Sequence, residues 1–287
     1  MVCKENSIVR LGLPKGRMEA GVMTLLRDAN INVSFGNRAY RPKTSLPGFE
    51  VKLQKPQNII EMLSAGSRDI GFAGKDWVAE LQADLVELLD TGMDPIRLVA
   101  AAPASVLKQR PKEIIVASEF ERLTKEWISK QDFDATFLRS YGATEVFPPE
   151  DADYIIDITQ TGATLEANSL EIVDQLIESS TRLYANPKCL DIPAKRDRIE
   201  GLVLVLRSVL DARKRVFMTL NVSKEDFEQV IEILPCMKAP TVYPLSRDSG
   251  FAISVAIPKE VLATLIPEIK SRGGTDIVVT QITQLVS

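Results

Sequence analysis

The feature that most constrains the fold of this chain is a short apolar strand that leads through a tight turn into a helix, and that occurs at three places. In the first, residues 8–13 form the strand, Pro-Lys-Gly forms the turn, and a helix follows. The apolar side of that helix consists of Met18, Val22, Leu25, Leu26 and Ala29. Such alternation predicts an α/β protein with parallel sheets covered by helices.

The other two units have recognisable helix starts. Residues 69–73 form a strand before Gly74 and Lys75, and Asp76 then has the position of an N-cap. In the segment EIIVASEFERLTKEWI, Ser118 and Glu121 have the spacing of a capping box after a strand. We therefore expect both helices to begin with a side chain that caps their free amide groups.

The end of the chain departs from this pattern. The order there is strand, helix, strand, strand, helix and strand, at residues 216–222, 224–234, 241–245, 250–257, 259–273 and 276–282. This βαββαβ order predicts a ferredoxin-like domain. Residues 193–215 are expected to form a connecting helix, with a domain boundary near Asp211. Residues 171–185 fit a helix by their apolar spacing and two strands by their Ser-Ser-Thr centre, so both assignments stay open.

Length and charge place the chain in a broad class. A length of 287 residues suits two or three folding units. The formal net charge of -4 comes without a basic stripe, which predicts no nucleic-acid partner. No apolar run approaches the ~18 residues of a membrane span, and residues 1–10 lack the apolar core of a signal peptide. We therefore expect a cytoplasmic protein that does not enter a membrane.

Two residue types limit the possible chemistry. Cys3, Cys189 and Cys236 are widely separated, which predicts plain thiols rather than disulfides or a zinc site. The chain has no histidine, so Ser-His and Cys-His nucleophilic catalysis is excluded and a transition-metal enzyme is disfavoured. Any chemistry must use carboxylates, cations, hydroxyls and backbone dipoles.

The segment YIIDITQTGATLEANSL, residues 154–170, predicts a buried strand that ends at a phosphate-binding turn. Ligands of open α/β sheets bind beyond the carboxyl ends of the strands, where the free amides of a helix start favour an anion. In the turn Thr161, Gly162, Ala163, Thr164, Leu165, the glycine permits close backbone approach and the hydroxyls add donors. The alternative is that Thr161 only caps a short helix.

Charged residues near the strands are further candidates. Asp157 lies beside the predicted phosphate turn, where a carboxylate could bind sugar hydroxyls or a metal ion, or could simply lie on an exposed edge. Lys15 and Arg17 follow the first strand and Lys75 follows the second, so these cations could converge on a polyphosphate. Each could also be a solvated turn residue. The chain lacks both the Walker spacing and a G-x-G-x-x-G after a strand, which disfavours a P-loop or a dinucleotide site.

Five segments together resemble ATP phosphoribosyltransferase in its long form, the first enzyme of histidine biosynthesis. They are LPKGRM, RDIGFAGKDW, IIVASEFERLT, GATEVFPPEDADYIIDITQTGATLEANSL and LPCMKAPTVYPL, in the family's order over nearly the whole chain. The resemblance implies that the phosphoribosyl group of 5-phosphoribosyl 1-pyrophosphate (PRPP) is transferred to N1 of the adenine of ATP. Mg²⁺ would assist, and pyrophosphate would be released.

The resemblance also implies an architecture. It is an α/β catalytic half with two lobes, like the periplasmic binding proteins, followed by a C-terminal ferredoxin-like βαββαβ domain. Residues 1–93 and 184–210 would form lobe I, and residues 94–183 would form lobe II with the PRPP loop. Residues 211–287 would form a regulatory domain that binds histidine as a feedback inhibitor. Family members of this form are homo-oligomers that shift between dimers and hexamers.

Carried over by position, the resemblance assigns roles to individual residues. The implied PRPP-binding residues are Asp157, Thr161, Gly162, Ala163, Thr164 and Leu165. The implied ATP-binding residues are Lys15, Gly16, Arg17, Gly74, Lys75 and Asp76. Asp157 and Glu145 are candidates for the ribose hydroxyls and the metal ion, and together with Arg17 they are the candidate catalytic residues. Thr241 matches a position that lines the family's inhibitor pocket.

Two segments depart from the family pattern. Where the family commonly has Arg-Pro-Gln-Asp-Ile-Pro, residues 55–60 read Lys-Pro-Gln-Asn-Ile-Ile. This change removes a carboxylate and the two-pronged guanidinium group of an arginine. It leaves Lys55 as a weak candidate for the nucleotide site. Residues 218–221 offer no carboxylate to pair with the amino group of a bound histidine.

Two other functions stay open at this point. The chain could be a two-lobed small-molecule sensor without turnover, or a phosphoribosyltransferase for another acceptor. Turnover with ATP and PRPP would separate the enzyme from the sensor, and competition between nucleobases and nucleotides would identify the acceptor.

Overall fold

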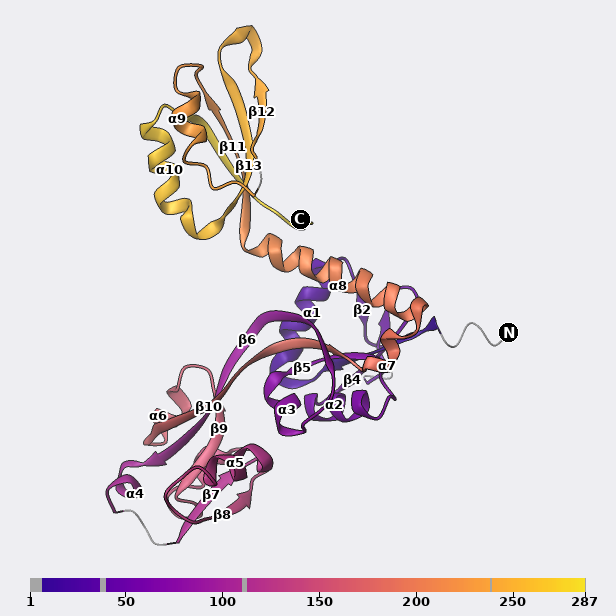
Figure 1. Cartoon of the computed structure of the whole chain (residues 1–287), viewed down its shortest axis with the longest axis vertical. Helices are drawn as coiled ribbons and strands as arrows, with labels where there is room; N and C mark the ends of the chain where they lie inside the picture. The colour runs from indigo at the N-terminus through magenta and orange to yellow at the C-terminus, as the bar shows by residue number, and fades with distance from the viewer. Residues whose placement is uncertain (1–6, 37–39, 110–112, 238, 287) are drawn as a thin grey trace. The chain divides into compact units, whose positions relative to one another are not determined.

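The computed structural model describes residues 7–36, 40–109, 113–237 and 239–286 of the chain (Figure 1). The chain divides into two compact units, of which one comprises residues 1–27 and 31–200 and the other residues 28–30 and 201–287. The helix expected near residues 193–215 is present as α8, Pro193–Arg213. No helix in the described ranges is long and apolar enough to cross a membrane.

The first unit is built on an eight-stranded sheet in the order β4-β1-β5-β10-β6-β9-β7-β8. The strands of this sheet are β1 Val9–Pro14, β4 Phe49–Gln54, β5 Ile70–Gly74, β6 Val86–Pro103, β7 Ile114–Ser118, β8 Ala135–Arg139, β9 Tyr154–Thr159 and β10 Leu170–Ala185. The small strands β2 Val33–Ser34 and β3 Lys43–Thr44 form a separate pair. The helices are α1 Glu19–Asp28, α2 Pro56–Ser64, α3 Lys75–Glu80, α4 Ala104–Gln109, α5 Glu121–Ile128, α6 Ala163–Ala167 and α7 Pro187–Leu190. The unit also contains two single 3₁₀ turns, η2 Gly16–Met18 and η3 Thr144–Val146.

Two sets of parallel strands form the two ends of this sheet. Strand β1 pairs with β4 and β5, and β7 pairs with β8 and β9, all in parallel. We call the half that contains β1, β4 and β5 lobe I, and the half that contains β7, β8 and β9 lobe II. Parallel strands joined by helices confirm what the strand–turn–helix alternation predicted.

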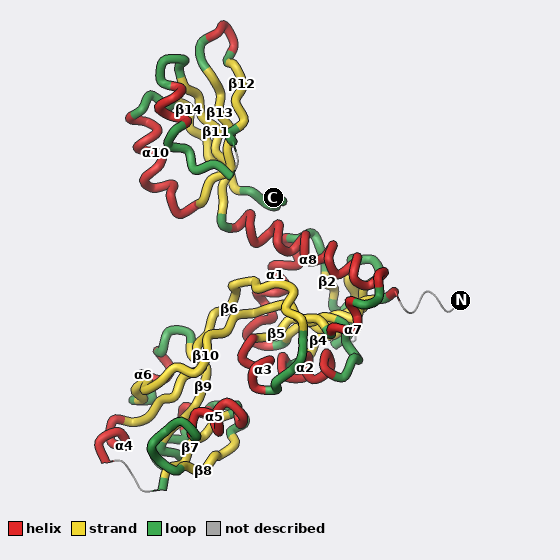
Figure 2. The backbone as a smooth tube through the Cα atoms, in the orientation of Figure 1, coloured by secondary structure: helices red, strands yellow, loops and turns green. Residues whose placement is uncertain are grey.

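The long strands β6 and β10 connect the lobes (Figure 2). They pair antiparallel along nearly their whole length, from Leu170 opposite Pro103 to Ala185 opposite Val86. Strand β10 also pairs with β5 in lobe I, whereas β6 also pairs with β9 in lobe II. The unit therefore has the two-lobed, periplasmic-binding-protein-like fold that was expected. The segment left open between helix and strands is one continuous strand, and its pairing makes the sheet mixed rather than wholly parallel.

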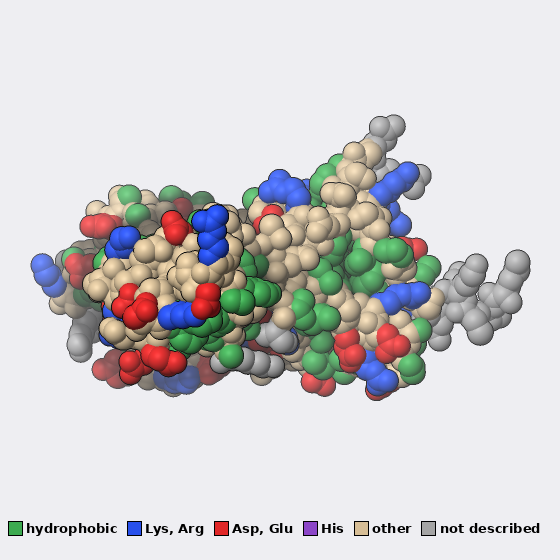
Figure 3. Space-filling model, turned by 90° about the horizontal axis from the view of Figure 1, so that it is seen from above, with side chains coloured by type: hydrophobic (Ala, Val, Ile, Leu, Met, Phe, Trp, Pro, Cys, Tyr) green, Lys and Arg blue, Asp and Glu red, His purple; other side chains and the backbone are tan. Residues whose placement is uncertain are grey.

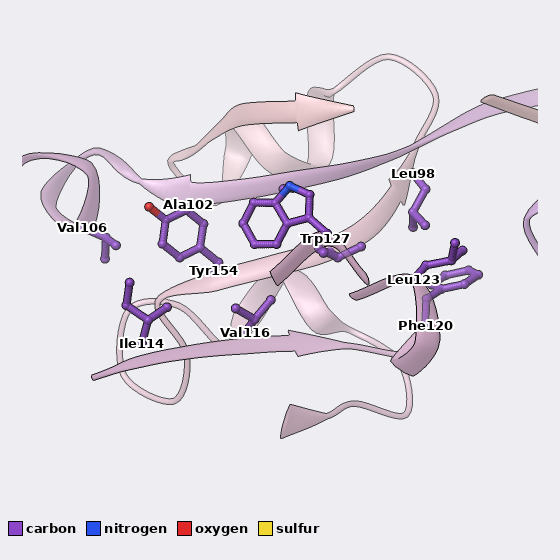
Figure 4. Packing of buried hydrophobic residues seen from close by; sticks show 11 residues of the cluster. Leu98, Ala102, Val106, Ile114, Val116, Phe120, Leu123, Trp127 and Tyr154 are labelled. Carbon is purple, nitrogen blue, oxygen red and sulfur yellow. The ribbon is translucent and has the colours of Figure 1, made fainter. Parts of the chain in front are cut away.

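Each lobe has its own hydrophobic core. In lobe I, the fully buried α2 residues Ile59, Ile60 and Leu63 pack against Ala73 of β5. In lobe II, the ring centroids of Trp127 and Tyr154 are 5.8 Å apart, and aliphatic residues of β6, β7 and α5 surround them (Figure 4). Because these cores seat α2 and α5 against the sheet, they fix the loops at the carboxyl ends of the parallel strands.

The two predicted helix caps are wrong. Gly74 stands at the N-cap of α3, and Asp76 lies inside the first turn. Phe120 stands at the N-cap of α5 and provides no side-chain hydrogen bond. Ser118 Oγ instead accepts from the Phe120 amide and donates to the carbonyl of Ile156, which lies in the neighbouring strand. The Ser118 hydroxyl therefore bonds to a neighbouring strand, whereas the local sequence spacing had predicted that it would cap the helix.

The second unit contains the four-stranded antiparallel sheet β12-β13-β11-β14. Its elements are β11 Arg215–Val222, α9 Phe227–Ile231, β12 Thr241–Pro244, β13 Phe251–Pro258, α10 Leu262–Ser271 and β14 Thr275–Gln281. Alternate residues of β11, among them Met218 and Leu220, are buried against Val230 of α9 and Ile269 of α10. Element order and strand order together confirm the predicted ferredoxin-like domain.

The distribution of surface charge agrees with the small net charge. On the face drawn in Figure 3, Lys and Arg side chains are interspersed with Asp and Glu side chains. A nucleic-acid-binding surface typically concentrates basic residues on one face or along one helix. The drawn face has no such concentration.

A buried ion cluster joins β1, the start of β5 and α8 within the first unit. The carboxylate of Asp69 accepts hydrogen bonds from the Arg10 amide at 2.8 Å, from Arg10 Nε at 3.2 Å and from Lys195 Nζ at 2.8 Å. The side chains of Asp69 and Lys195 are only 4% and 6% exposed. Burial alone would raise the pKa of Asp69, but the hydrogen bonds from Arg10 and Lys195 outweigh it and hold that pKa below its usual range.

We expect Asp69→Ala to lower the free energy of unfolding of the first unit by about 3 kcal/mol, because Lys195 then stays buried without its partner. Lys130→Ala, which removes an exposed ion pair with Glu126, should leave that free energy nearly unchanged. Urea unfolding at neutral pH measures both. The folded-state pKa of Asp69 is depressed, so its stabilisation is present above pH ~4 and is lost as the pH falls further. Equal losses in the two variants would contradict this assignment.

Candidate active site

A cavity of about 220 Å³ lies between the lobes, beyond the carboxyl ends of their parallel strands. From lobe I it is lined by Lys15, Arg17, Met18, Pro56, Gln57, Asp76 and Trp77. From lobe II it is lined by Glu119, Phe120, Gly142, Ala143, Thr144, Asp157 and Ile158. Four predicted site residues, Lys15, Arg17, Asp76 and Asp157, therefore line one cavity. Lys55 is not among its lining residues, although Pro56 and Gln57 of the same segment are.

The lobe I cations stand in the turn after β1. Gly16 adopts a φ of +79°, which L side chains rarely take, and so allows the chain to turn sharply between Lys15 and Arg17. Lys15 Nζ lies 4.3 Å from the centre of the Tyr40 ring. Arg17 Nη1 donates to the carbonyl of Asp94 in the crossing strand β6 at 3.0 Å. A hydrogen bond to a neutral carbonyl leaves the charge of Arg17 available to a ligand.

Asp76 is held at the start of α3, in contact with the other crossing strand. Ser179 Oγ of β10 donates to Asp76 Oδ1 at 2.6 Å and accepts from the Asp76 amide. A Cβ at Gly74 would lie 2.0 Å from that same carboxylate oxygen, so only glycine fits there. Burial raises the pKa of Asp76, and the Ser179 hydrogen bond and the charge of Arg17 oppose that rise.

Lys75 does not line this cavity. Its charge acts on Asp90 of β6, whose pKa burial would raise but which the Gly92 amide, Ser180, Arg182 and Lys75 together lower. The structure therefore places Asp76 in the cavity wall, and Gly74 leaves room for its carboxylate. The charge of Lys75 acts instead on Asp90 in the crossing strand β6.

Asp157 supplies the negative charge of the lobe II wall. It is half-buried in β9, and its Oδ1 accepts from the Ile158 amide at 2.7 Å. Burial, followed by repulsion from Glu145 and Glu119, raises its pKa to about 6, against the Ile158 hydrogen bond. Glu145 in η3 is not among the cavity-lining residues, but it is close enough to act on the charge of Asp157.

The predicted phosphate turn leads into α6 through a glycine in the left-handed region. Gly162 adopts a φ of +89° at the N-cap of α6, and its amide donates to Thr159 Oγ1 at 2.9 Å. Leu165 is buried and anchors the turn, whereas Thr161, Ala163 and Thr164 are exposed. The amides of Thr164 and Leu165 meet no acceptor in the described part of the chain. Two N–H groups are thus free for an anion.

The turn does not line the 220 Å³ cavity. The residue before it, Gln160, lines a second cavity of about 500 Å³. That second cavity also includes Arg97 of β6 and Arg182 of β10. The predicted phosphate turn and the cation turn of lobe I are therefore at different places in this conformation.

Several lining residues escaped the sequence analysis. Glu119 and Phe120 follow β7, and Gly142, Ala143 and Thr144 follow β8. The rule that ligands lie beyond the carboxyl ends of parallel strands would have found both groups, because both directly follow strands of the sheet. Trp77 and Ser179 gave no comparable signal, since their places depend on pairing between distant segments.

In the ranges that the structure describes, no group of three or more Asp, Glu or Cys residues could hold a metal. The charges of Glu145 and Glu119 both act on Asp157 and help to raise its pKa. Carboxylate oxygens fit Mg²⁺, which keeps several waters and is usually bound by one or two carboxylates plus phosphate oxygens.

A cleft between two α/β lobes, lined by cations and a buried carboxylate on one wall and by carboxylates on the other, is typical of a protein that binds a small polar ligand. Residues 55–208 match the family model for HisG, ATP phosphoribosyltransferase, and residues 212–284 match that for the HisG C-terminal domain. The chain therefore belongs to the ATP phosphoribosyltransferase family, in its long form, and the family's reaction is the first step of histidine biosynthesis.

Individual relatives agree over the full length. The chain is 34% identical to the ATP phosphoribosyltransferase of Chlorobium luteolum, with 98% of both chains covered. It is 35% identical to that of Pelotomaculum thermopropionicum, with 97% of this chain and 99% of the relative covered. Among solved structures, the ATP phosphoribosyl transferase (HisG:HisZ) complex from Thermotoga maritima matches with a TM-score of 0.63 and 27% identity. That match covers 71% of this chain and 99% of the other.

We expect Asp157→Asn to raise the free energy of unfolding at pH 7.5 by on the order of 1 kcal/mol, because an ionised carboxylate is then no longer buried beside two others. Since the folded-state pKa is raised to about 6, the gain should be present above that pH and shrink as the pH falls below it. Urea unfolding at several pH values measures it. Glu171→Gln, at an exposed position of β10, is the matched control and should show no such dependence. A gain that does not change with pH would contradict the shifted pKa.

Proposed function

We propose that the cleft transfers the phosphoribosyl group of PRPP to N1 of the adenine of ATP and releases pyrophosphate. The observation that carries this proposal is the turn after β9, where a glycine in the left-handed region precedes two amides without acceptors. Such amides suit a terminal phosphate monoester. Family membership supplies the two substrates.

In this proposal PRPP binds to lobe II. Its 5-phosphate contacts Thr161, Gly162, Ala163, Thr164 and Leu165. Asp157 binds the ribose hydroxyls, and Asp157 with Glu145 provides the carboxylates for Mg²⁺. The ion would neutralise the pyrophosphate as it leaves. The raised pKa of Asp157 supports this role, since a bound cation would relieve the repulsion among the carboxylates.

ATP binds to lobe I in the same proposal. Lys15, Gly16 and Arg17 contact its phosphates from the first turn, and Gly74, Lys75 and Asp76 form the second nucleotide loop. The positions of Lys15, Arg17 and Asp76 on one cavity wall support this assignment. Arg17 would also approach the reacting centre, where its charge opposes the negative charge of the pyrophosphate.

The proposed chemistry needs alignment and charge more than proton transfer. The bond from C1 of the ribose to pyrophosphate breaks, and a bond from C1 to adenine N1 forms. The ribose gains oxocarbenium character between these events, which nearby carboxylates stabilise, while cations stabilise the departing group. Adenine N1 already carries a lone pair, so no general base is required. A chain without histidine can therefore catalyse this reaction.

For the second unit we propose the regulatory role, with histidine as inhibitor and Thr241 at its site. Thr241 is exposed in β12. A carboxylate next to β11 is that of Asp276 on β14, which accepts from Asn221 Nδ2 at 3.0 Å, but β14 and β12 are opposite edges of the sheet. We further propose that residues 1–93 with 184–210, 94–183, and 211–287 act as the three functional parts, in a homo-oligomer that ranges from dimer to hexamer and works in the cytoplasm.

Substitutions in the turn test the PRPP site. Gly162→Val should weaken PRPP binding severely, because a branched side chain blocks backbone approach and strains the left-handed conformation. Thr164→Ala should weaken it about tenfold through the loss of one hydroxyl donor to a charged group. Calorimetric titration with PRPP and Mg²⁺ measures both. Gly201→Ala, in α8 with open space around the added Cβ, is the control. Unchanged affinity in Gly162→Val would rule out the turn as the phosphate site.

Turnover tests the whole proposal. With ATP, PRPP and Mg²⁺, the chain should produce the altered ultraviolet absorbance of N1-substituted adenine, and histidine should slow that change. Thr241→Val should reduce the inhibition without changing the uninhibited rate, whereas Thr264→Val on α10 should change neither. Persistent absence of product would favour a sensor without turnover. Product from another nucleobase, in preference to ATP, would identify a different acceptor.

A further inference from the structure

Helices α3 of lobe I and α5 of lobe II meet end to end at a pair of reciprocal contacts. The carboxylate of Glu80, the last residue of α3, accepts from the Arg122 amide at 2.9 Å and from the Leu123 amide at 3.0 Å. In return, the Arg122 guanidinium donates to the carbonyl of Ala79 at 2.7 Å and to that of Glu80 at 3.1 Å. Each helix end is thus capped by a charged side chain from the other lobe.

This arrangement provides acceptors for amides that a helix leaves unpaired at its start, and it adds donors to the carbonyls at the end of α3, of which that of Ala79 also accepts from the Gln82 amide. The amides of Arg122 and Leu123 belong to the first turn of α5, where Phe120 provides no side-chain cap. The carbonyls of Ala79 and Glu80 belong to the last turn of α3. An anion at a helix start and a cation at a helix end both oppose the helix dipole favourably. Glu80 is only 9% exposed, so solvent screens these contacts little.

An aromatic pair continues the contact into the cleft. The rings of Trp77 in α3 and Phe120 before α5 are stacked, with centroids 4.6 Å apart and planes 29° apart. Both side chains line the 220 Å³ cavity. The same short helix therefore contributes Asp76 and Trp77 to the cavity and Glu80 to the contact with lobe II. Any change in the Glu80 contact should reach the cavity wall within one turn of helix.

We propose that Glu80 and Arg122 form an interlobe clasp that sets the separation between the lobe I cations and Asp157 of lobe II. This inference rests on the proposed function, in which ATP and PRPP bind to different lobes. Glu80 is then a positioning residue: it contacts neither substrate, yet it fixes the angle at which the two walls face each other. The crossing strands alone leave that angle adjustable, because β10 has register shifts against β6 on both sides of Thr181.

Hydrogen exchange of the unliganded full chain tests the clasp directly. In Glu80→Gln the charge and one acceptor are lost, so exchange at the amides of Arg122 and Leu123 should accelerate about tenfold or more. Glu126→Gln is the matched control, because Glu126 is the exposed i,i+4 partner of Arg122 and, within the described residues, forms no hydrogen bond or ion pair with lobe I. That variant should leave both amides protected.

Kinetics then test the positioning role. PRPP is proposed to bind within lobe II, so Glu80→Gln should leave its dissociation constant within about twofold of the unmodified value. The transfer rate kcat should fall roughly tenfold or more, since misplacing reacting groups by an ångström can cost about 10²-fold. A general loss of structure would instead weaken PRPP binding as well. Glu126→Gln should change neither quantity.

Each outcome has a definite meaning. Unchanged exchange at Arg122 and Leu123 in Glu80→Gln would overturn the clasp, and faster exchange with an unchanged kcat would overturn its role in positioning. If Glu80→Gln fails to fold, Arg122→Gln serves as the second variant, because it removes the guanidinium contacts but keeps the capped amides. It should lower kcat with PRPP affinity retained. Absence of turnover in the unmodified chain would contradict the proposed function alone, and the exchange result would still decide the clasp.

Discussion

The backbone hydrogen bonds between β6 and β10 are the interaction on which the rest of this structure depends. Without that antiparallel pair, two parallel sheets of three strands would remain, each with an exposed edge. With it, both edges are covered and the two lobes share one sheet. The price is irregularity, since β10 shifts register repeatedly against β6. The shifts on both sides of Thr181 lie beside hydroxyl groups that reach the site: Ser179 bonds to Asp76, and Thr181 bonds to Asp94. The crossing therefore supports the site as well as the fold.

The two walls of the cleft differ in charge, because among its described lining residues only those of lobe I include cations. Lys15 and Arg17 stand on lobe I, whereas Asp157 and Glu119 stand on lobe II. On lobe I the charge of Arg17 favours the ionised form of Asp76, whereas on lobe II Asp157 is repelled by its acidic neighbours. The excess of negative charge on lobe II is costly in the empty protein, and the Mg²⁺ of the proposed reaction would offset it. The same repulsion contributes, after burial, to the raised pKa of Asp157, a residue proposed to contact substrate.

The sequence predicted the helices and strands better than it predicted which distant segments pair or bond with them. Strand–turn–helix alternation and the βαββαβ tail were enough for the α/β lobes and the ferredoxin-like domain, because each depends on local periodicity. The long strand at residues 171–185 was ambiguous, since its Ser-Ser-Thr centre is polar for a reason only the crossing reveals. The caps at Asp76 and Ser118 were wrong, because distant segments supply the bonds that local spacing seemed to assign. The same holds for the candidate site. The turns after β1, β5 and β9 could be found from the sequence, whereas Glu80 and Ser179 could not, because their contacts join distant segments.

The absence of histidine clarifies what such a cleft has to accomplish. When the attacking nitrogen already has a free lone pair, no proton must be removed before the new bond forms, and charge and distance become the main catalytic variables. Side chains can supply charge from either lobe independently, but distance depends on both lobes at once. Contacts that fix one lobe against the other can then affect the rate of the reaction even where they touch no substrate. In this chain, Glu80 at the end of α3 and Arg122 at the start of α5 form such contacts, because each caps the helix of the other lobe.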